Sequence, residues 1–282
     1  MRPVLVTGGA GTLGRAFGRL CDARGLACRL ASRAELDIAD AEAVADALAR
    51  HAPWLVVNAA GYVRVDDAEL DRERCWRENA LGPATLARAC AHARIPLISF
   101  SSDLVFDGGK QTPYHEADAP APLGTYGRSK LEGELRVLDA NPSALVIRTS
   151  AFFGPWDEYN FVTSVLRTLA GGGGVRAASD IFVSPTYVPD LVDAALDLAI
   201  DGEHGLWHLA NVGTTTWADL ARAAARLAGA AADRVIAVAG RELPWRAPRP
   251  AFSVLGSTRG ALLPALDDAL RRYHATRTPE PR

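Results

Sequence analysis

The sequence near the N-terminus reads Val4-Leu5-Val6-Thr7-Gly8-Gly9-Ala10-Gly11-Thr12-Leu13-Gly14, a short apolar run followed by a glycine-rich turn. The apolar residues suit a buried parallel strand, and Phe17, Leu20 and Cys21 continue the segment with helical spacing. Glycines at positions 8, 11 and 14 permit a tight turn and let the backbone approach a pyrophosphate at the helix N-terminus. Glycine-rich turns are common, but the strand before this one and the helix after it favour a dinucleotide site.

A second short strand is predicted at residues 28–31, and it ends at Ser32 and Arg33. In an NAD site, an acidic residue at this strand end usually holds the ribose hydroxyls of the adenosine. A hydroxyl and a guanidinium suit a 2′-phosphate better, so the sequence favours NADPH, with NADH still possible. The alternative is that Arg33 is a solvated surface residue.

Strand and helix patterns then alternate along the chain. An amphipathic helix is predicted at 40–50, a strand at 54–57, a long helix at 67–93 and another strand at 96–100. This rhythm indicates an α/β fold with a doubly wound, Rossmann-type parallel sheet covered by helices on both faces. Ligands bind such sheets at the carboxyl ends of the strands, where the glycine turn and Asn58-Ala59-Ala60-Gly61 fall.

Length and composition exclude several classes of protein. The chain has 282 residues, 49% hydrophobic and 23% charged, which is typical of a globular protein with one large or two closely joined domains. A net charge of -2 gives no support to nucleic-acid or membrane-surface binding. No apolar run approaches the roughly eighteen residues of a membrane helix, and no export signal is recognised. The four cysteines form no Cys-x-x-Cys pair, so we expect reduced thiols and a cytoplasmic location.

A tyrosine and a lysine stand four residues apart in Tyr126-Gly127-Arg128-Ser129-Lys130. Of the 31 basic residues only two are lysine, so a compact ammonium at this spacing is notable. On a helix the two side chains share a face, and the cation could make the phenol more acidic. Ser101-Ser102-Asp103 ends the 96–100 strand and points to the same crevice. The alternative for the pair alone is an exposed tyrosine and a solvated lysine.

Taken together, these motifs resemble an extended short-chain dehydrogenase/reductase, and most closely the dTDP-4-dehydrorhamnose reductase family. The resemblance runs along the whole chain and is carried by the glycine turn at 7–14, Asn58-Ala59-Ala60-Gly61-Tyr62, Ser101-Ser102-Asp103-Leu104-Val105-Phe106-Asp107-Gly108, residues 126–134, Arg148-Thr149-Ser150, Ser184-Pro185-Thr186-Tyr187, Trp207-His208-Leu209-Ala210-Asn211 and residues 249–255.

The resemblance implies NADPH-dependent reduction of the 4-keto group of a nucleotide-activated deoxysugar. Tyr126 would donate the proton, Lys130 would lower the pKa of the tyrosine and hold the nicotinamide ribose, and Ser102 would hydrogen-bond the substrate oxygen. The predicted cofactor-binding residues are Gly8, Gly11, Thr12, Leu13, Gly14, Ser32, Arg33, Asp37, Ile38, Ala59, Ala60, Gly61, Tyr62, Tyr126 and Lys130. The predicted substrate-binding residues are Ser102, Asp103, Tyr126, Ala151, Asn160 and Arg249.

Two positions depart from the family pattern. The family usually carries an aromatic residue where Leu104 stands and a tryptophan where Ala151 stands. Loss of both rings removes stacking area and is expected to reshape the hexose pocket. Leu104 stands directly after Asp103, where sugar-nucleotide dehydratases carry a second acidic residue, and this disfavours water elimination.

The predicted organisation is a dinucleotide-binding Rossmann domain at residues 1–150, rejoined by about 184–203, and a smaller α/β substrate-binding domain in most of 151–282. Helices are expected at 189–200, 217–228 and 264–273, and a frayed tail from Ala275 to Arg282. His204 and His208 have metal-ligand spacing only on a helix, and the apolar residues between them favour a strand, so no metal site is expected.

Alternatives to a reductase remain open at this point. One is a sugar-nucleotide epimerase that uses the same three residues and retains NAD through each turnover. Another is a non-catalytic, nucleotide-sensing regulatory subunit, against which the intact Ser102, Tyr126 and Lys130 speak. A homodimer is a further possibility.

Overall fold

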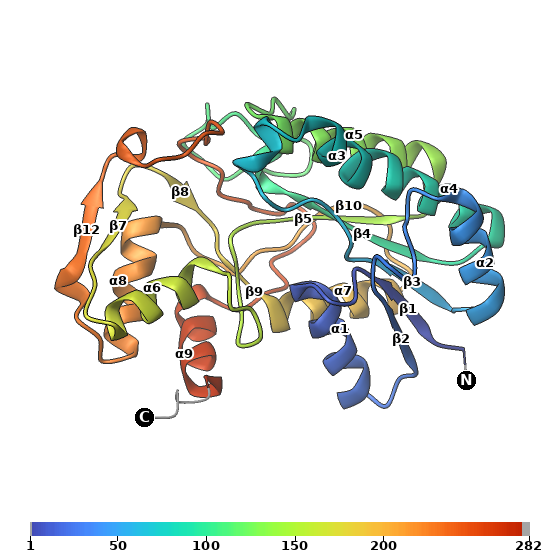
Figure 1. The fold of residues 1–282 in the computed structure, drawn as a ribbon, viewed down its shortest axis with the longest axis horizontal. Helices are drawn as coiled ribbons and strands as arrows, with labels where there is room; N and C mark the ends of the chain where they lie inside the picture. The colour runs from blue at the N-terminus through green and yellow to red at the C-terminus, as the bar shows by residue number, and fades with distance from the viewer. Residues whose placement is uncertain (1, 278–282) are drawn as a thin grey trace.

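The structure is a computed structural model that describes residues 2–277. Its main sheet has six parallel strands in the order β10-β5-β4-β3-β1-β2 (Figure 1). The strands are β1 (Val4–Thr7), β2 (Cys28–Ala31), β3 (Leu55–Asn58), β4 (Leu97–Ser102), β5 (Leu145–Thr149) and β10 (Gly205–His208). The predicted α/β class and doubly wound parallel sheet are confirmed.

Helices cover both faces of this sheet (Figure 1). One face carries α1 (Thr12–Ala23) and α7 (Val188–Ile200), and the other carries α2 (Ala41–His51), α4 (Gly82–Ala93) and α5 (Thr125–Ala140). Successive side chains of a strand point to opposite faces. Val4 and Val6 therefore pack with α1 and α7, whereas Leu5 between them packs with α2 and α4.

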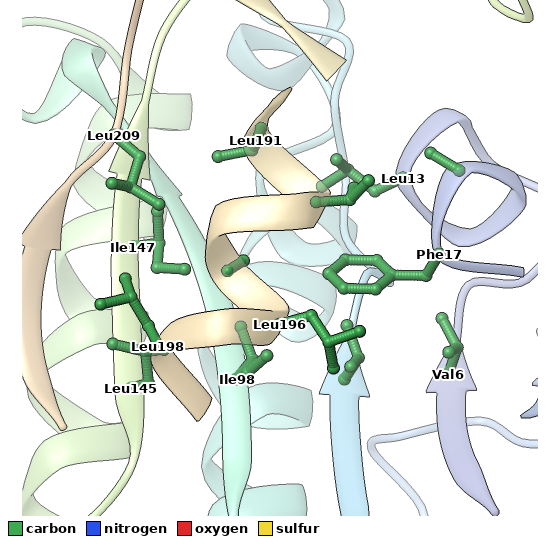
Figure 2. Packing of buried hydrophobic residues seen from close by; sticks show 14 of the residues in the cluster. Val6, Leu13, Phe17, Ile98, Leu145, Ile147, Leu191, Leu196, Leu198 and Leu209 are labelled. Atoms are coloured by element: carbon green, nitrogen blue, oxygen red, sulfur yellow. The ribbon is translucent and has the colours of Figure 1, made fainter. Parts of the chain in front are cut away.

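The core between the sheet and the α1–α7 layer is dense (Figure 2). Phe17 from α1 and Leu196 from α7 are fully buried together with Ile98 and Ile147 from the central strands. Because these residues come from four elements distant in sequence, this core fixes the sheet edge from which the ligand-facing loops extend.

The chain reverses its direction of travel across the sheet at β1. From β1 it crosses to β2 on one side and then to β3 on the other, and Thr7 of β1 lies in register with Asn58 of β3. The Thr7 hydroxyl donates a hydrogen bond to Oδ1 of Asn58 at 2.9 Å. In doubly wound sheets the ligand crevice opens at this switch point, beyond the carboxyl ends of the strands.

The helix predicted at 67–93 is not one regular helix. It consists of a 3₁₀ turn (Asp67–Glu69), α3 (Arg72–Trp76), a π-helical turn (Arg77–Leu81) and α4. The π turn places Asn79 inward, where its side chain bonds the backbone N–H and C=O of Tyr62. Such turns frequently occur at functional sites, and a hydrophobic repeat does not reveal them.

The remaining elements form a smaller α/β lobe (Figure 1). Its elements are β6 (Phe152–Phe153), α6 (Phe161–Ala170), β7 (Val175–Ala178), β8 (Phe182–Val183), β9 (Thr186–Tyr187), β11 (Thr215–Thr216), α8 (Trp217–Leu227), β12 (Val235–Val238) and α9 (Leu266–Thr276), with 3₁₀ turns at Ala232–Arg234 and Gly240–Glu242. A further 3₁₀ turn, Asp103–Val105, follows β4 of the main sheet. Strand β7 pairs with β12, β6 with β9 and β8 with β11. Phe153, Leu166, Leu220 and Leu270 lie in its core.

The three late helices occur where the sequence predicts them, as α7, α8 and α9. Helix α9 continues through Ala275 and Thr276, so a frayed tail from Ala275 is wrong for these two residues, and 278–282 lie outside the described residues. In residues 2–277 no helix combines the length and apolarity needed to cross a membrane.

A buried ion pair joins α5 to the central sheet. Glu134 of α5 and Arg148 of β5 form two hydrogen bonds, of 2.8 and 2.6 Å, and both side chains are only 3% exposed. Removing one member of such a pair leaves the other charge buried without a partner.

We therefore expect Glu134→Ala to lower the free energy of unfolding by about 3–5 kcal/mol. The surface pair Glu132–Arg136 on the same helix is the matched control, because an exposed i,i+4 pair contributes only about 0.3–0.5 kcal/mol. Urea unfolding of Glu134→Ala and Glu132→Ala measures both. Equal losses in the two variants would contradict the structural role of the buried pair.

Candidate active site

The glycine turn packs directly against the end of β3. Gly8 has a φ of +65°, and a Cβ there would lie 2.6 Å from the carbonyl oxygen of Ala59. A Cβ on Gly14 would lie 2.4 Å from the carbonyl oxygen of Gly8. Neither position accepts a side chain, which explains why glycine stands at both.

The surroundings of this turn fit a dinucleotide. Helix α1 begins after Gly11, whose N-cap position carries no side-chain hydrogen bond, so the N–H groups of Thr12 and the first turn stay available to an anion. Across the crevice the small residues Ala59, Ala60 and Gly61 follow β3 and line a large cavity together with Leu13. Backbone donors beside a wall without bulky side chains are what a pyrophosphate requires.

The cavity has a volume of about 710 Å³ and extends from the carboxyl edge of the main sheet to the smaller lobe. Ser102, Tyr126 and Lys130 lie in its wall, so the structure brings the three predicted catalytic residues together. On the side of the smaller lobe, the lining residues are Arg176, Ala177, Ala178, Ile181, Val183, Trp217, Leu243, Pro244, Trp245, Arg249, Pro250 and Ser253.

Three elements position the catalytic side chains. Ser102 is the last residue of β4, where its hydroxyl donates to Asp103 and accepts from the N–H of Leu104. Tyr126 lies in the first turn of α5, and Lys130 one turn later. The Nζ atom of Lys130 donates to the carbonyl oxygen of Phe100 at 3.1 Å and lies 5.9 Å from the centre of the Tyr126 ring.

Burial sets the protonation of this pair, and it acts against the sequence prediction. Burial raises the pKa of Tyr126 above its usual value, and the nearby charge of Asp103 adds to this, while a hydrogen bond with Ser102 lowers it in part. Burial also lowers the pKa of Lys130 to about 8. The pKa of Tyr126 is therefore raised, whereas a cation beside an exposed phenol would lower it, because burial has the largest effect on this group.

Asp103 lies beneath the catalytic residues and is 5% exposed. It accepts hydrogen bonds from three hydroxyl groups: Ser102 at 3.0 Å, Ser150 at 2.8 Å and Ser253 at 2.6 Å. Burial raises the pKa of Asp103, and these three hydrogen bonds oppose the rise. The carboxyl group thus ties together the ends of β4 and β5 and the 249–255 segment beside the cavity.

Five residues predicted to bind the cofactor lie outside the cavity wall: Ser32, Arg33, Asp37 and Ile38, which follow β2, and Tyr62, which follows β3. Arg33 forms an ion pair with Glu78, and Asp37 forms one with Arg77 at 2.9 Å. The Ser32 hydroxyl donates to Glu35 at 2.8 Å. Of the other two predicted here, Ile38 packs in the core, and Tyr62 is buried with its backbone held by Asn79.

The predicted substrate residues divide into two groups. Ser102, Asp103, Tyr126, Ala151 and Arg249 line the cavity, and Leu104 lies there as well. Asn160 does not: it caps the N-terminus of α6, where its oxygen accepts from the N–H of Thr163 and its nitrogen donates to Asp157. Both polar atoms of the Asn160 side chain are therefore occupied by hydrogen bonds at the N-terminus of α6.

Other cavity residues carry no sequence signal. Arg176 projects from the short strand β7 and provides a second guanidinium in the same wall as Arg249. Trp217 and Trp245 also line the cavity. Only the fold brings these residues, which are remote in sequence, to one surface.

His208 lies on β10, as expected for a strand, and the residue is only 3% exposed. Nδ1 faces the carbonyl oxygens of Tyr114 and Gly256, and Nε2 faces Arg148 at 3.4 Å. Burial and the charge of Arg148 lower the pKa of His208 to about 4, so the ring is neutral and structural. No cluster of three or more potential metal-binding side chains occurs within residues 2–277.

The crevice opens at the switch point of a parallel sheet, beside a glycine turn, and a serine, a tyrosine and a lysine lie in its wall. This combination defines the class of extended short-chain dehydrogenases/reductases. Comparison with known proteins identifies the family within this class. The family described as RmlD substrate binding domain matches residues 1–272. The chain belongs to this family.

Individual relatives agree with this assignment. A dTDP-4-dehydrorhamnose reductase of Mycolicibacterium smegmatis is 38% identical over 260 residues, which cover 92% of this chain and 79% of the relative. A probable dTDP-4,6-dihydroxy-2-methyloxan-3-one 4-ketoreductase of Streptomyces antibioticus is 39% identical over 257 residues, 90% of this chain and 87% of that protein. The crystal structure of a dTDP-4-dehydrorhamnose reductase from Bacillus anthracis in complex with NADP superposes with a TM-score of 0.93 at 28% identity, covering 97% of this chain and 99% of that one.

The lowered pKa of Lys130 can be measured directly, because Lys110 and Lys130 are the two lysines of the chain. In protein labelled with ¹³C at the lysine Cε, we expect one signal to titrate with a midpoint at about pH 8. That signal is expected to be missing from Lys130→Arg. A Lys130 signal that stays constant between about pH 7 and about pH 9 would show that the ammonium is not desolvated.

Proposed function

We propose that this protein uses NADPH to reduce the 4-keto group of a nucleotide-activated 6-deoxysugar, with Tyr126 as the proton donor. The observation that carries the proposal is the shared cavity of Ser102, Tyr126 and Lys130, which opens beside the glycine turn. The names of the curated relatives, among them two ketoreductases of dTDP-sugars, support the same reaction.

The chemistry of the three side chains suits reduction of a ketone. When bound, a reduced nicotinamide supplies a hydride, and the carbonyl oxygen that gains negative charge must receive a proton. Tyr126 is protonated at neutral pH, because burial raises its pKa, and it is therefore ready to give that proton. The Ser102 hydroxyl lines the same cavity, and by turning from Asp103 it would donate to the same substrate oxygen.

Lys130 contributes a charge that favours the tyrosinate formed after proton transfer. Its ammonium is largely protonated at pH 7, one unit below a pKa of about 8, and its contact with the Phe100 carbonyl directs it along the cavity wall. The positive charge of Lys130 thereby offsets part of the free energy that burial adds to formation of the tyrosinate. The glycine turn, Thr12, Leu13 and Ala59–Gly61 would hold the dinucleotide, with Lys130 near its ribose.

The substrate end of the cavity suits a nucleoside diphosphate. Arg176 and Arg249 offer two guanidinium groups for phosphate oxygens, and Trp217 and Trp245 offer flat surfaces for a base or a sugar. Leu104 and Ala151 present only aliphatic groups beside Ser102, so recognition of the hexose relies less on aromatic stacking than the family pattern implies.

We also infer how the chain is divided between these tasks. Residues 1–150, with α7 and β10, form the dinucleotide-binding unit, since α7 and β10 pack with or join the main sheet. Most of residues 151–282 serves the substrate. Four free thiols support a reducing compartment such as the cytoplasm. A homodimer remains a prediction.

The direct test is oxidation of NADPH by freshly generated dTDP-4-keto-6-deoxyhexoses. We expect turnover with at least one such ketosugar and a decrease in kcat of at least about a hundredfold in Tyr126→Phe, because the proton donor is lost. Absorbance at the NADPH band follows the reaction. Binding of NADPH to Tyr126→Phe, measured by fluorescence, is expected to persist and serves as the control for folding.

Two results would contradict the proposal. Purified protein that carries stoichiometric, non-exchanging NAD and consumes no NADPH would indicate an epimerase. Cellular function that is unchanged in Tyr126→Phe would indicate a non-catalytic, nucleotide-sensing subunit.

The preference for NADPH depends on Arg33. Its guanidinium pairs with Glu78 and remains about half exposed, so a 2′-phosphate at the end of β2 can compete for it. We expect Arg33→Ala to weaken NADPH binding about tenfold or more, as for loss of one charge-assisted hydrogen bond. NADH binding, measured by the same calorimetric titration, is expected to change little. Equal weakening of both cofactors would assign Arg33 a structural role instead.

A further inference from the structure

A short connection after β3 lines the active-site cavity and bonds to α5 and to residues 246–249. Residues 63–70, which we call the β3–α3 segment, lie between the Ala59–Tyr62 loop and α3. Val63 and Val65 line the cavity. Ala68 is fully buried in a small cluster with Tyr62 and Cys75, against which Tyr126 packs. Asp66 and Glu69 of this segment bond to other elements.

Glu69 bonds the beginning of the catalytic helix. Its Oε1 accepts from the backbone N–H of Thr125 at 2.6 Å, and its Oε2 accepts from the Thr125 hydroxyl at 2.9 Å. Helix α5 begins at Thr125, and its N-cap Gly124 supplies no side-chain cap, so Glu69 caps the helix from outside. A carboxylate at a helix N-terminus is also favoured by the helix dipole.

The packing around this cap is close. A Cβ on Gly124 would lie only 2.9 Å from Oε1 of Glu69 and 3.5 Å from Pro248. Because Tyr126 follows Thr125 directly, a shift of the cap moves the phenol within the cavity.

Asp66 bonds the segment that carries Arg249. Its Oδ1 accepts from the backbone N–H groups of Arg246 and Ala247, both at 2.9 Å, and its Oδ2 accepts from Nη2 of Arg249 at 3.1 Å. The Arg249 guanidinium also lies over the Trp245 ring, 5.3 Å from its centre. Arg249 and Trp245 both line the cavity, so Asp66 fixes the direction of a substrate-side cation.

We propose that Asp66 and Glu69 are positioning residues with separate tasks: Glu69 sets the place of Tyr126 for proton transfer, and Asp66 sets the place of Arg249 for binding of the nucleotide diphosphate. The inference rests on the proposed function. Its physical basis is that one rigid turn of chain holds the catalytic helix and the substrate segment at a fixed separation. A displacement of about 1 Å in such a site costs up to about a hundredfold in rate.

Steady-state kinetics separates the two tasks. In Glu69→Ala we expect kcat to fall by about tenfold to a hundredfold while KM for the nucleotide sugar changes little, since Arg249 keeps its partner. Glu69→Gln retains one acceptor oxygen, so its kcat is expected to lie between those of Glu69→Ala and the wild type. If Glu69→Ala does not fold, Glu69→Gln provides the same test with a smaller decrease.

Asp66→Asn is expected to give the opposite pattern. The amide oxygen can still accept from the Arg246 and Ala247 N–H groups, but its nitrogen cannot accept from Arg249. KM for the nucleotide sugar should rise about tenfold, with kcat and the KM for NADPH nearly unchanged. Asp67→Asn is the matched control: Asp67 belongs to the same segment, is exposed, and only approaches Arg64 at 3.8 Å.

Hydrogen–deuterium exchange tests the same contacts without any turnover. We expect faster exchange at residues 125–128 in Glu69→Ala and at 245–249 in Asp66→Asn, each without a change in the other region. Absence of turnover in the wild type would therefore refute the proposed function and leave this test in force. The positioning inference is overturned if kcat and KM change together in both variants, if neither variant differs from Asp67→Asn, or if exchange rises in both regions alike.

Discussion

The site depends on the close contact between the glycine turn and the end of β3. With Gly8 against the Ala59 carbonyl and Gly14 against Gly8, two loops from adjacent parallel strands meet without any side chain between them. Because of this contact, the uncapped first turn of α1 and the cavity-lining residues Ala59–Gly61 lie next to each other at the crevice. Tyr126 and Lys130 have a defined position only relative to that wall, because α5 packs across the same strands.

Desolvation is the second constraint, and it changes the electrostatic account of the catalytic pair. An ammonium in water near a phenol would favour the phenolate, but here both groups lie in a partly buried wall. Each is pushed toward its neutral form, with the pKa of Tyr126 raised and that of Lys130 lowered. A tyrosine that keeps its proton suits an enzyme working in the reductive direction, where the proton must be present when hydride transfer begins.

The sequence was sufficient for those features that are encoded locally. The 4–14 segment specifies a strand, a turn and a helix by its residue types alone, and the spacing of Tyr126 and Lys130 needs only one helical turn. The rule that parallel strands end at one edge places Ser102 at the crevice, whereas its meeting with Tyr126 and Lys130 was expected from the family resemblance. The sequence was insufficient wherever a property arises from burial or from long-range contact. Arg176, the committed side chain of Asn160, the π turn at 77–81 and the direction of the Tyr126 pKa shift all belong to this second kind.

The low pKa of Lys130 has a consequence for chemical targeting of this enzyme. An amine with a pKa of about 8 is a nucleophile at mildly alkaline pH, when ordinary lysines remain protonated. Lys130 is the one lysine in the cavity wall, within a pocket shaped for a nucleotide. A nucleotide analogue that carries an aldehyde or an activated ester therefore has one amine within reach of its binding site, and the scarcity of lysine makes covalent labelling selective.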